Sequence, residues 1–420
     1  MNTAVKDKNK KYYAMLIASG FFLYLMSICI KMVYSAELVT IIPYFNTTKS
    51  DAALGLTFYY VAYSATQLLI ATKIKIKNFK RFLCVTTLLS SLSFGMIIIS
   101  NSMWQIWIIL GLNGIFQSSV WGGIMHYFGK YLPDSYSNAV SLIMSLAFAL
   151  GTAVAYGASS AFVAVLNWKY TFVFFAALML ISLILFAVSE KIVKARVCKT
   201  EVKESGEEKL YIRDDSIINT ISKKNLYKLV FYLCGMTFLV CCIYYGLTNW
   251  VPSLLKEVHG VGDSYSMLIT ILIPVGTMFG PVVANYACEK NGMVFRALTL
   301  LSLIVSVFPL ILIFAYDFNI VFFIIASVIL LFFNRGMMNL ICGYLPLKLR
   351  HVLNSGSGAM LFNAASCMGA AIVPTATGYL MDVSGENSWR NLYIMISVCA
   401  ILLLLLSLNG AIKQKNKRLF

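Results

Sequence analysis

The sequence predicts an all-α, polytopic membrane protein in which twelve transmembrane helices form two pseudo-symmetric six-helix bundles. The first observation is composition: 60% of the 420 residues are hydrophobic and only 12% are charged, whereas a soluble globular chain carries about a quarter charged residues. The second is that apolar stretches of about 20 residues, enough to cross a hydrocarbon core about 30 Å thick, recur along the whole chain. The third is a weak internal repeat between the two halves of the sequence.

Twelve segments meet the length and composition of a transmembrane helix. They are residues 14–43, 53–72, 82–100, 104–128, 139–161, 169–189, 227–252, 265–284, 295–315, 319–341, 353–380 and 389–410. The first segment follows a polar, basic start, but it is too long for the core of a signal peptide and lacks an A-x-A-like cleavage site. We therefore expect it to be retained as the first helix.

The net charge of +17 is explained by where the basic residues lie. With a cytoplasmic N-terminus, the inner tails and loops hold 28 of the 34 Lys and Arg: four in residues 1–12, five in 73–81, Lys130, ten in 191–228, Lys290, Arg296, Lys348, Arg350 and four in 413–418. The outer loops hold four: Lys49, Lys169, Lys256 and Arg390. This positive-inside pattern predicts a multi-pass protein of the plasma (inner) membrane with both termini in the cytoplasm, and the basic runs need no nucleic-acid partner. We expect the protein to be a monomer.

A charged segment divides the chain. Residues 190–226 mix Glu and Asp with Lys and Arg, which is typical of a solvated linker. This predicts an N-terminal six-helix bundle at 1–189, a cytoplasmic linker at 190–226, and a C-terminal six-helix bundle with a basic cytoplasmic tail at 227–420.

Two short motifs of the N-terminal half recur in the C-terminal half, each at a similar distance along the chain. Tyr-Leu-Pro at 131–133 recurs at 344–346, and Trp168 before the sixth segment recurs as Trp389 before the twelfth. Carriers built from parallel repeats show such internal similarity.

Small residues in the eighth segment predict close helix packing. Gly276 and Gly280 are four residues apart and precede Pro281. In lipid, such glycines let helix backbones approach each other, and a proline can supply a hinge.

The 6+6 arrangement resembles the major facilitator superfamily, and the stretches 114–121, 246–258 and 378–382 are similar to its organophosphate:phosphate antiporter branch and the neighbouring sugar-acid carriers. The resemblance implies that helices one, four, seven and ten line a central cavity. It also aligns Ser35 and Tyr244 with two arginines that clamp phosphate in the organophosphate branch.

The same resemblance implies gating loops on the cytoplasmic side. The superfamily loop between helices two and three reads like G-x-x-x-D-R, whereas residues 71–76 contain no acid here. The C-terminal counterpart keeps an acid and a base, Glu289 and Lys290, which are therefore candidate gating residues.

Beyond the first two residues of each predicted segment, four acidic, basic or histidine side chains lie inside the segments, where a charge costs about 3 kcal/mol. They are Lys31, Glu37, His126 and Arg335. We expect Lys31 and Arg335 to attract an anionic group near the midplane, because a planar guanidinium suits carboxylate or phosphate. The alternative is a structural ion pair with Glu37, or a lysine that extends to the interface.

Glu37 and His126 each allow two interpretations. Glu37 could carry a coupling proton, because burial favours a neutral carboxyl, or it could only balance Lys31 or lie at the rim. Tyr34 lies three residues from both Lys31 and Glu37 and could bridge them. His126 could titrate during turnover, or it could be a hydrogen-bonded histidine at a helix end.

Uncharged candidates complete the predicted site. They are polar residues of helices seven, ten and eleven that either bond between helices or contact substrate hydroxyls: Tyr244, Tyr245, Asn249, Asn334 and Asn363.

These features predict a secondary carrier for a small organic anion, such as a sugar acid, carboxylate or organophosphate, that works by alternating access. Proton coupling through Glu37 is left open. No Walker motif is present, and no cofactor, metal or enzymatic activity is expected. The alternatives are a transporter-derived sensor, or an efflux carrier for an uncharged or drug-like solute.

Overall fold

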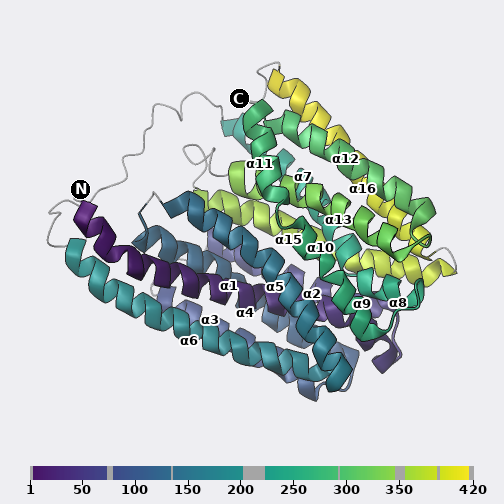
Figure 1. The fold of residues 1–420 in the computed structure, drawn as a ribbon, viewed down its shortest axis with the longest axis horizontal. Coiled ribbons are helices and arrows are strands. Elements are labelled where there is room, and N and C mark those ends of the chain that lie inside the picture. The colour runs from purple at the N-terminus through teal and green to yellow at the C-terminus, as the bar shows by residue number, and fades with distance from the viewer. Residues whose placement is uncertain are drawn as a thin grey trace.

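The computed structural model describes residues 3–72, 79–133, 136–201, 223–291, 294–345, 355–385 and 388–415. These residues are helical almost throughout, contain no strand, and include twelve helical spans that are long and apolar enough to cross a membrane (Figure 1). The predicted fold class is therefore confirmed. Large apolar side chains such as Leu92, Ile184 and Phe318 are exposed on the surface, as expected where lipid is the surrounding solvent.

The N-terminal half contains six spans. They are formed by α1 (Thr3–Phe45), α2 (Lys49–Thr72), α3 (Phe79–Gly95) with the short 3-10 helix η1 (Met96–Ile99), α4 (Met103–Tyr131), α5 (Ser137–Val165) and α6 (Trp168–Glu201).

The C-terminal half also contains six spans, several of them interrupted. They are formed by α7 (Lys223–Thr248) with α8 (Val251–Glu257), by α9 (Asp263–Thr270) with α10 (Leu272–Thr277) and α11 (Gly280–Asn291), by α12 (Val294–Ala315), by α13 (Ile320–Asn339) with the π-helix η4 (Leu340–Tyr344), by α15 (Ser355–Val383) and by α16 (Ser388–Lys415).

The interruptions follow the prolines of the sequence. Proline lacks a backbone N–H and clashes with the carbonyl four residues earlier, so it favours the first turn of a helix. Pro252 lies in the first turn of α8, and Pro281 lies in the first turn of α11. The eighth span, predicted at 265–284 with a hinge at Pro281, consists of three short helices, and the last of them, α11, begins next to that proline.

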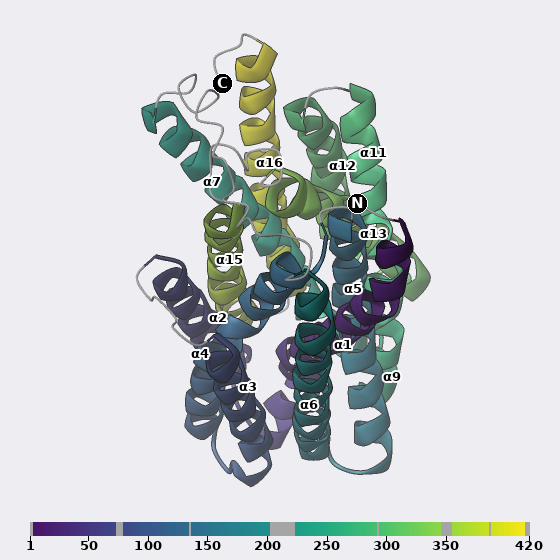
Figure 2. The same cartoon turned by 90° about the vertical axis from the view of Figure 1, so that its left-hand side faces the viewer.

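The same helix pairings occur in both halves (Figure 2). In the N-terminal half α1 packs on α5 and α6, α2 packs on α4, and α3 packs on α4 and α6. In the C-terminal half the equivalent spans repeat this scheme: α7 packs on α15 and α16, α10 and α11 pack on α13, and α12 packs on α13 and α16. The two bundles are thus pseudo-symmetric. Residues 202–222, in the predicted linker, lie outside the described residues, whereas α6 continues beyond the predicted bundle boundary at 189.

The halves meet along two seams. The longer one joins α2 to α15, where Thr57 donates to the carbonyl of Ala371 (2.5 Å) and Ser64 donates to the carbonyl of Ala364 (3.1 Å). The other joins α5 to α9 and α10, and there the hydroxyl of Ser264 on α9 donates to the carbonyl of Ser160 on α5 (2.9 Å). The cationic and aromatic residues at the centre come from α1, α2, α4 and α5 of one half and from α7 and α13 of the other.

Candidate substrate-binding site

Lys31 on α1 and Arg335 on α13 reach the same central region from opposite halves. Both side chains are partly buried. The Nζ of Lys31 lies 4.3 Å from the centroid of the Tyr63 ring, and the Cζ of Arg335 lies 3.9 Å from that of Phe148. Tyr24 is close enough to both cations to interact with each electrostatically. The structure thus places these two predicted residues around one shared aromatic group.

Aromatic rings from both halves surround the two cations. The ring of Tyr24 lies 4.6 Å from that of Trp121, and the ring of Tyr60 on α2 lies 5.4 Å from that of Tyr245 on α7. Tyr244 lies 5.1 Å from Tyr245, with its ring 5.5 Å from the Cζ of Arg335. Ring faces attract cations, so they help to retain positive charge away from bulk water.

No carboxylate lies within ion-pair distance of Lys31 or Arg335 in the described part of the chain, where Glu257, Glu190 and Asp263 pair instead with Lys49, Lys80 and Lys256. The sequence alternative of a structural ion pair with Glu37 is therefore wrong. Two cations without an acidic partner make this region electropositive.

Glu37 instead faces the interior of the N-terminal half. Its carboxyl is fully buried, and it accepts hydrogen bonds from Thr171 of α6 (3.1 Å) and from Thr40 (2.8 Å). It neither balances Lys31 nor lies at an exposed rim, so both of these alternatives are wrong. Tyr34 does not bridge the two residues, because its hydroxyl donates to the carbonyl of Ala52 on α2 (2.6 Å).

Three buried candidates have a polar atom with no hydrogen-bond partner among the described residues. They are the hydroxyl of Ser35, the amide nitrogen of Asn249 and the amide oxygen of Asn334. The amide nitrogen of Asn334 donates to the carbonyl of Val240 on α7 (3.2 Å). Because buried polar groups normally have partners, these atoms are suited to bind water or a polar ligand.

The remaining predicted residues lie elsewhere or play other parts. The amide of Asn363 on α15 donates to Gln67 on α2 (2.7 Å), so it joins the halves. His126 is exposed near the end of α4, with its ring in edge contact with that of Tyr127 (5.5 Å). The backbones of Glu289 and Lys290 belong to α11, but their side chains lie outside the described residues.

Sequence reasoning missed Tyr24, Tyr63 and Phe148 as neighbours of the cations. Tyr24 lies seven residues before Lys31, which is about two helical turns, so the two share a face of α1. That spacing could have identified Tyr24. Nothing in the sequence indicates Phe148, because it reaches Arg335 only through the packing of the two halves.

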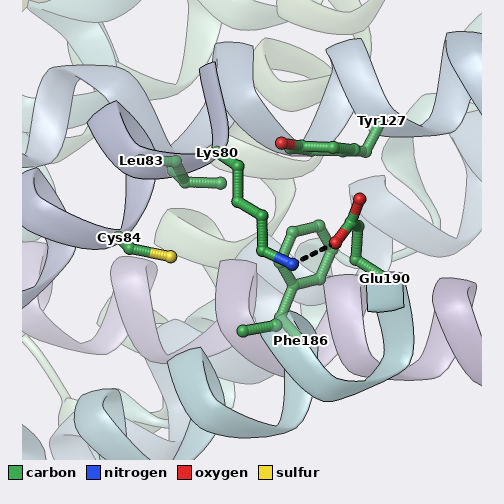
Figure 3. A pocket seen from close by; sticks show the side chains of 7 residues that line it. Lys80, Leu83, Cys84, Tyr127, Phe186 and Glu190 are labelled. Atoms are coloured by element: carbon green, nitrogen blue, oxygen red, sulfur yellow. Dashed lines mark hydrogen bonds and ion pairs between the residues drawn. The ribbon is translucent and has the colours of Figure 1, made fainter. Parts of the chain in front are cut away.

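A second polar cluster joins α3 to α6 within the N-terminal half. Figure 3 shows the ammonium of Lys80 pointing at the carboxylate of Glu190 beside Tyr127 and Phe186, and the two charges form an ion pair. The hydroxyl of Tyr131 donates to the other oxygen of Glu190 (3.1 Å). The Glu190 side chain is 5% exposed and that of Lys80 44% exposed, so the carboxylate depends on these partners more than the lysine does.

Replacing Lys80 with methionine should lower the free energy of unfolding by about 1–2 kcal/mol, because it leaves a buried carboxylate with one hydrogen-bond donor fewer. Thermal unfolding in detergent measures the effect as a lower melting temperature. Lys191→Met is the matched control, since Lys191 is exposed on the same helix as Glu190. Equal melting temperatures for the two variants would contradict the stabilising role.

Two packed six-helix halves with a central, electropositive, aromatic-lined region define the class of a membrane carrier. A family model described as the Major Facilitator Superfamily matches residues 20–366, and the chain belongs to that superfamily. It is therefore a multi-pass membrane transporter of the secondary type rather than an enzyme. No curated protein matches the chain.

Solved structures share the fold at low identity. A bacterial homologue of the human lysosomal transporter Spinster, inward-facing and unoccupied, matches with a TM-score of 0.70 and 12% identity, over 95% of this chain and 96% of that one. The nucleoside transporter NupG matches with a TM-score of 0.68 and 11% identity, over 95% of this chain and 98% of that one. At these identities the likeness shows the fold alone.

Proposed function

We propose that this protein carries a small organic anion across the plasma (inner) membrane by alternating access, with both termini in the cytoplasm. The observation that carries the proposal is that Lys31 and Arg335, from opposite halves, both lie near Tyr24 and have no acidic partner in the described part of the chain. An apolar solute would need neither charge. An anion would neutralise both charges and so offset part of the free energy that they cost in the membrane.

The placement of the cations on different halves suits the alternating-access mechanism. In this mechanism two bundles rock about a central site. A ligand that contacts both bundles interacts differently with each conformation, and only such a difference shifts the equilibrium between them. Lys31 and Arg335 would provide this difference.

A sugar acid, carboxylate or organophosphate fits the residues around the cations. The guanidinium of Arg335 can bind two oxygens of a carboxylate or phosphate at once, and the amide oxygen of Asn334 and the amide nitrogen of Asn249, which have no partner among the described residues, can bind hydroxyls. The stretches 114–121, 246–258 and 378–382, which resemble the organophosphate:phosphate antiporters and the sugar-acid carriers, support the same class of anionic substrate. The two phosphate-binding arginines of the organophosphate branch are replaced here by Ser35 and Tyr244, which favours a sugar acid or carboxylate over a phosphate ester, although Arg335 places a cation 5.5 Å from the Tyr244 ring.

The test is a ligand panel on the purified protein, followed by uptake into liposomes. Hexuronates, dicarboxylates and sugar phosphates should raise the melting temperature, whereas the corresponding neutral sugars should not. Equal stabilisation by neutral sugars or by hydrophobic drugs would overturn the proposal in favour of an uncharged solute. Anion binding without any flux would favour a sensor.

We further propose that Glu37 carries the coupling proton. The hydroxyls of Thr40, Ser159 and Thr171 surround it from α1, α5 and α6, and Asp263 of α9 is the other charged group near it. No cation pairs with it in the described part of the chain, so protonation is the available way to remove its charge from the membrane interior.

Glu37→Gln should abolish the stimulation of anion uptake by an inward proton gradient while leaving anion exchange without a gradient within about twofold. Glutamine keeps the shape and hydrogen bonding of a protonated carboxyl, so the carrier is held in one protonation state. Liposome uptake with and without a pH gradient measures both activities. Thr171→Val is the control for lost hydrogen bonding; an unchanged gradient response in Glu37→Gln would contradict proton coupling at this residue.

A further inference from the structure

A group of polar contacts joins the two halves at the end of the molecule opposite to the start of α1. We call this group, Lys49, Ser50, Glu257, Asp382 and Trp389, the distal latch. Asp382 lies in the last turn of α15, and Lys49 is the first residue of α2. One carboxylate oxygen of Asp382 accepts the backbone N–H of Lys49 (3.0 Å), and the other accepts that of Ser50 (2.8 Å).

Asp382 therefore caps α2 from the other half of the protein. The first N–H groups of a helix have no partner within the helix, and the positive end of the helix dipole favours a negative charge there. A helix is normally capped by a residue just before its own first turn. Thr48 caps α2 in this way by accepting the N–H of Asp51 (3.1 Å), whereas the N–H groups of Lys49 and Ser50 are capped by a carboxylate of α15. These two hydrogen bonds exist only while the halves touch at this end.

The side chain of Lys49 makes the second part of the latch. Its Nζ lies 2.7 Å from Oε2 of Glu257 in α8, and it lies 4.7 Å from the ring of Trp389 in α16. The indole N–H of Trp389 donates to the same carboxylate oxygen (3.2 Å). One residue of the N-terminal half thus contacts three different helices of the C-terminal half.

The backbones also approach closely at this point. A Cβ atom added to Gly378 would lie 2.9 Å from the carbonyl carbon and oxygen of Lys49, closer than real Cβ atoms come to backbone. Glycine at this position lets α15 reach the start of α2, which brings Asp382 within hydrogen-bond distance. The close contact and the capping bonds therefore depend on each other.

We infer that the distal latch sets the balance between the two conformations of this carrier by holding its distal end closed. Separation of the halves at this end breaks two charge-assisted hydrogen bonds and one ion pair together. Both carboxylates of the latch, Glu257 and Asp382, are exposed, so water can replace these bonds once they break, and the latch can open and close repeatedly. The inference depends on alternating access and not on the identity of the substrate.

The same end of the molecule provides a matched control. Lys256 in α8 and Asp263 in α9 form an ion pair of 2.7 Å, but both residues belong to the C-terminal half. Breaking that pair removes a bond of similar length and exposure without releasing one half from the other.

The test is the distance between the halves at the distal end in the full-length protein. Spin labels are attached at Asn101→Cys and Phe318→Cys, two exposed positions on opposite halves, with the native cysteines replaced. Asp382→Ala should raise the population with the longer label separation about tenfold, because both capping bonds are lost. Lys49→Met keeps the capping bonds and should raise the population with the longer label separation by a smaller factor. Lys256→Met should leave this population unchanged.

Two outcomes would overturn the inference. One is an unchanged distance distribution in Asp382→Ala, provided that its circular dichroism shows the helical content of the unmodified protein. The other is an equal change in Lys256→Met, which would mean that any loss of charge at this end has the same effect. If Asp382→Ala does not fold, Asp382→Asn replaces it, because the amide oxygen can still accept one of the two N–H groups.

Discussion

Arg335→Gln should weaken binding of the transported anion by about 10- to 100-fold, the range expected for loss of a charge-assisted hydrogen-bonded pair. The guanidinium is held against Phe148 and Tyr244 without an acidic partner in the described part of the chain, so an anion is the group best able to pair with it. Arg335→Lys keeps the charge but loses the planar fork, and it should retain part of the affinity. Titration calorimetry with the best anion from the ligand panel measures both variants.

Arg296→Gln is the control for a general loss of positive charge, because Arg296 is exposed on α12 of the same half. The Arg296→Gln variant should bind the anion with the same affinity as the unmodified protein. The assignment of Arg335 to the binding site is contradicted if Arg335→Gln binds the anion with a Kd within twofold of that of the unmodified protein and has the same melting temperature. Lys31→Ala, tested in parallel, shows whether the cation from the other half contributes as well.

Gly280→Ala should destabilise the protein by about 3 kcal/mol or prevent folding, since overpacking a tight contact costs about 1–3 kcal/mol and occasionally more. A Cβ at this position would lie 2.2 Å from the backbone oxygen of Phe332 on α13, and a backbone atom cannot move aside as a side-chain end can. Gly114→Ala should behave similarly, because its Cβ would lie 2.2 Å from the backbone oxygen of Tyr59 on α2. Thermal unfolding and expression yield measure these effects.

Gly235→Ala is the matched control for these glycines. Gly235 lies inside α7, and a Cβ there would meet no atom within 4 Å. Alanine is favoured over glycine in a helix by about 1 kcal/mol, so this variant should be as stable as the unmodified protein or more stable. A similar loss of stability in all three variants would show that the close helix contacts are not the cause.

The glycines that contact the backbone of a neighbouring helix also show where the two halves differ. Gly114 lies on the fourth span and touches the second, whereas Gly280 lies on the eighth span and touches the tenth. These are equivalent helix pairs, but in the C-terminal pair a second glycine, Gly336 of the tenth span, faces Gly280, and a Cβ added to it would lie 2.9 Å from the backbone oxygen of Gly280. Sequence reasoning found Gly276 and Gly280 as packing residues, yet it had no means of naming their partners, because spacing along one helix contains no information about the helix opposite.

For the candidate site, the sequence predicted the charges better than their contacts. Lys31 and Arg335 were identifiable because an ionisable residue inside an apolar segment is costly and rare. The interpretation of Glu37 was less complete. Its helical position relative to Lys31 was evident, but the hydroxyl of Thr171 comes from another helix, 134 residues away.

By itself, the sequence determined that the chain is a membrane protein with twelve helical spans in two related halves, because hydrophobicity, segment length and charge asymmetry are local properties that act on each segment separately. Tertiary structure alone decided which side chains meet. The aromatic faces beside Arg335, the separation of Glu37 from Lys31, and the capping of α2 by Asp382 all depend on how helices from distant parts of the chain rotate and pack. Those orientations arise from close-range contacts between helices and leave no periodic signal in the sequence of either one.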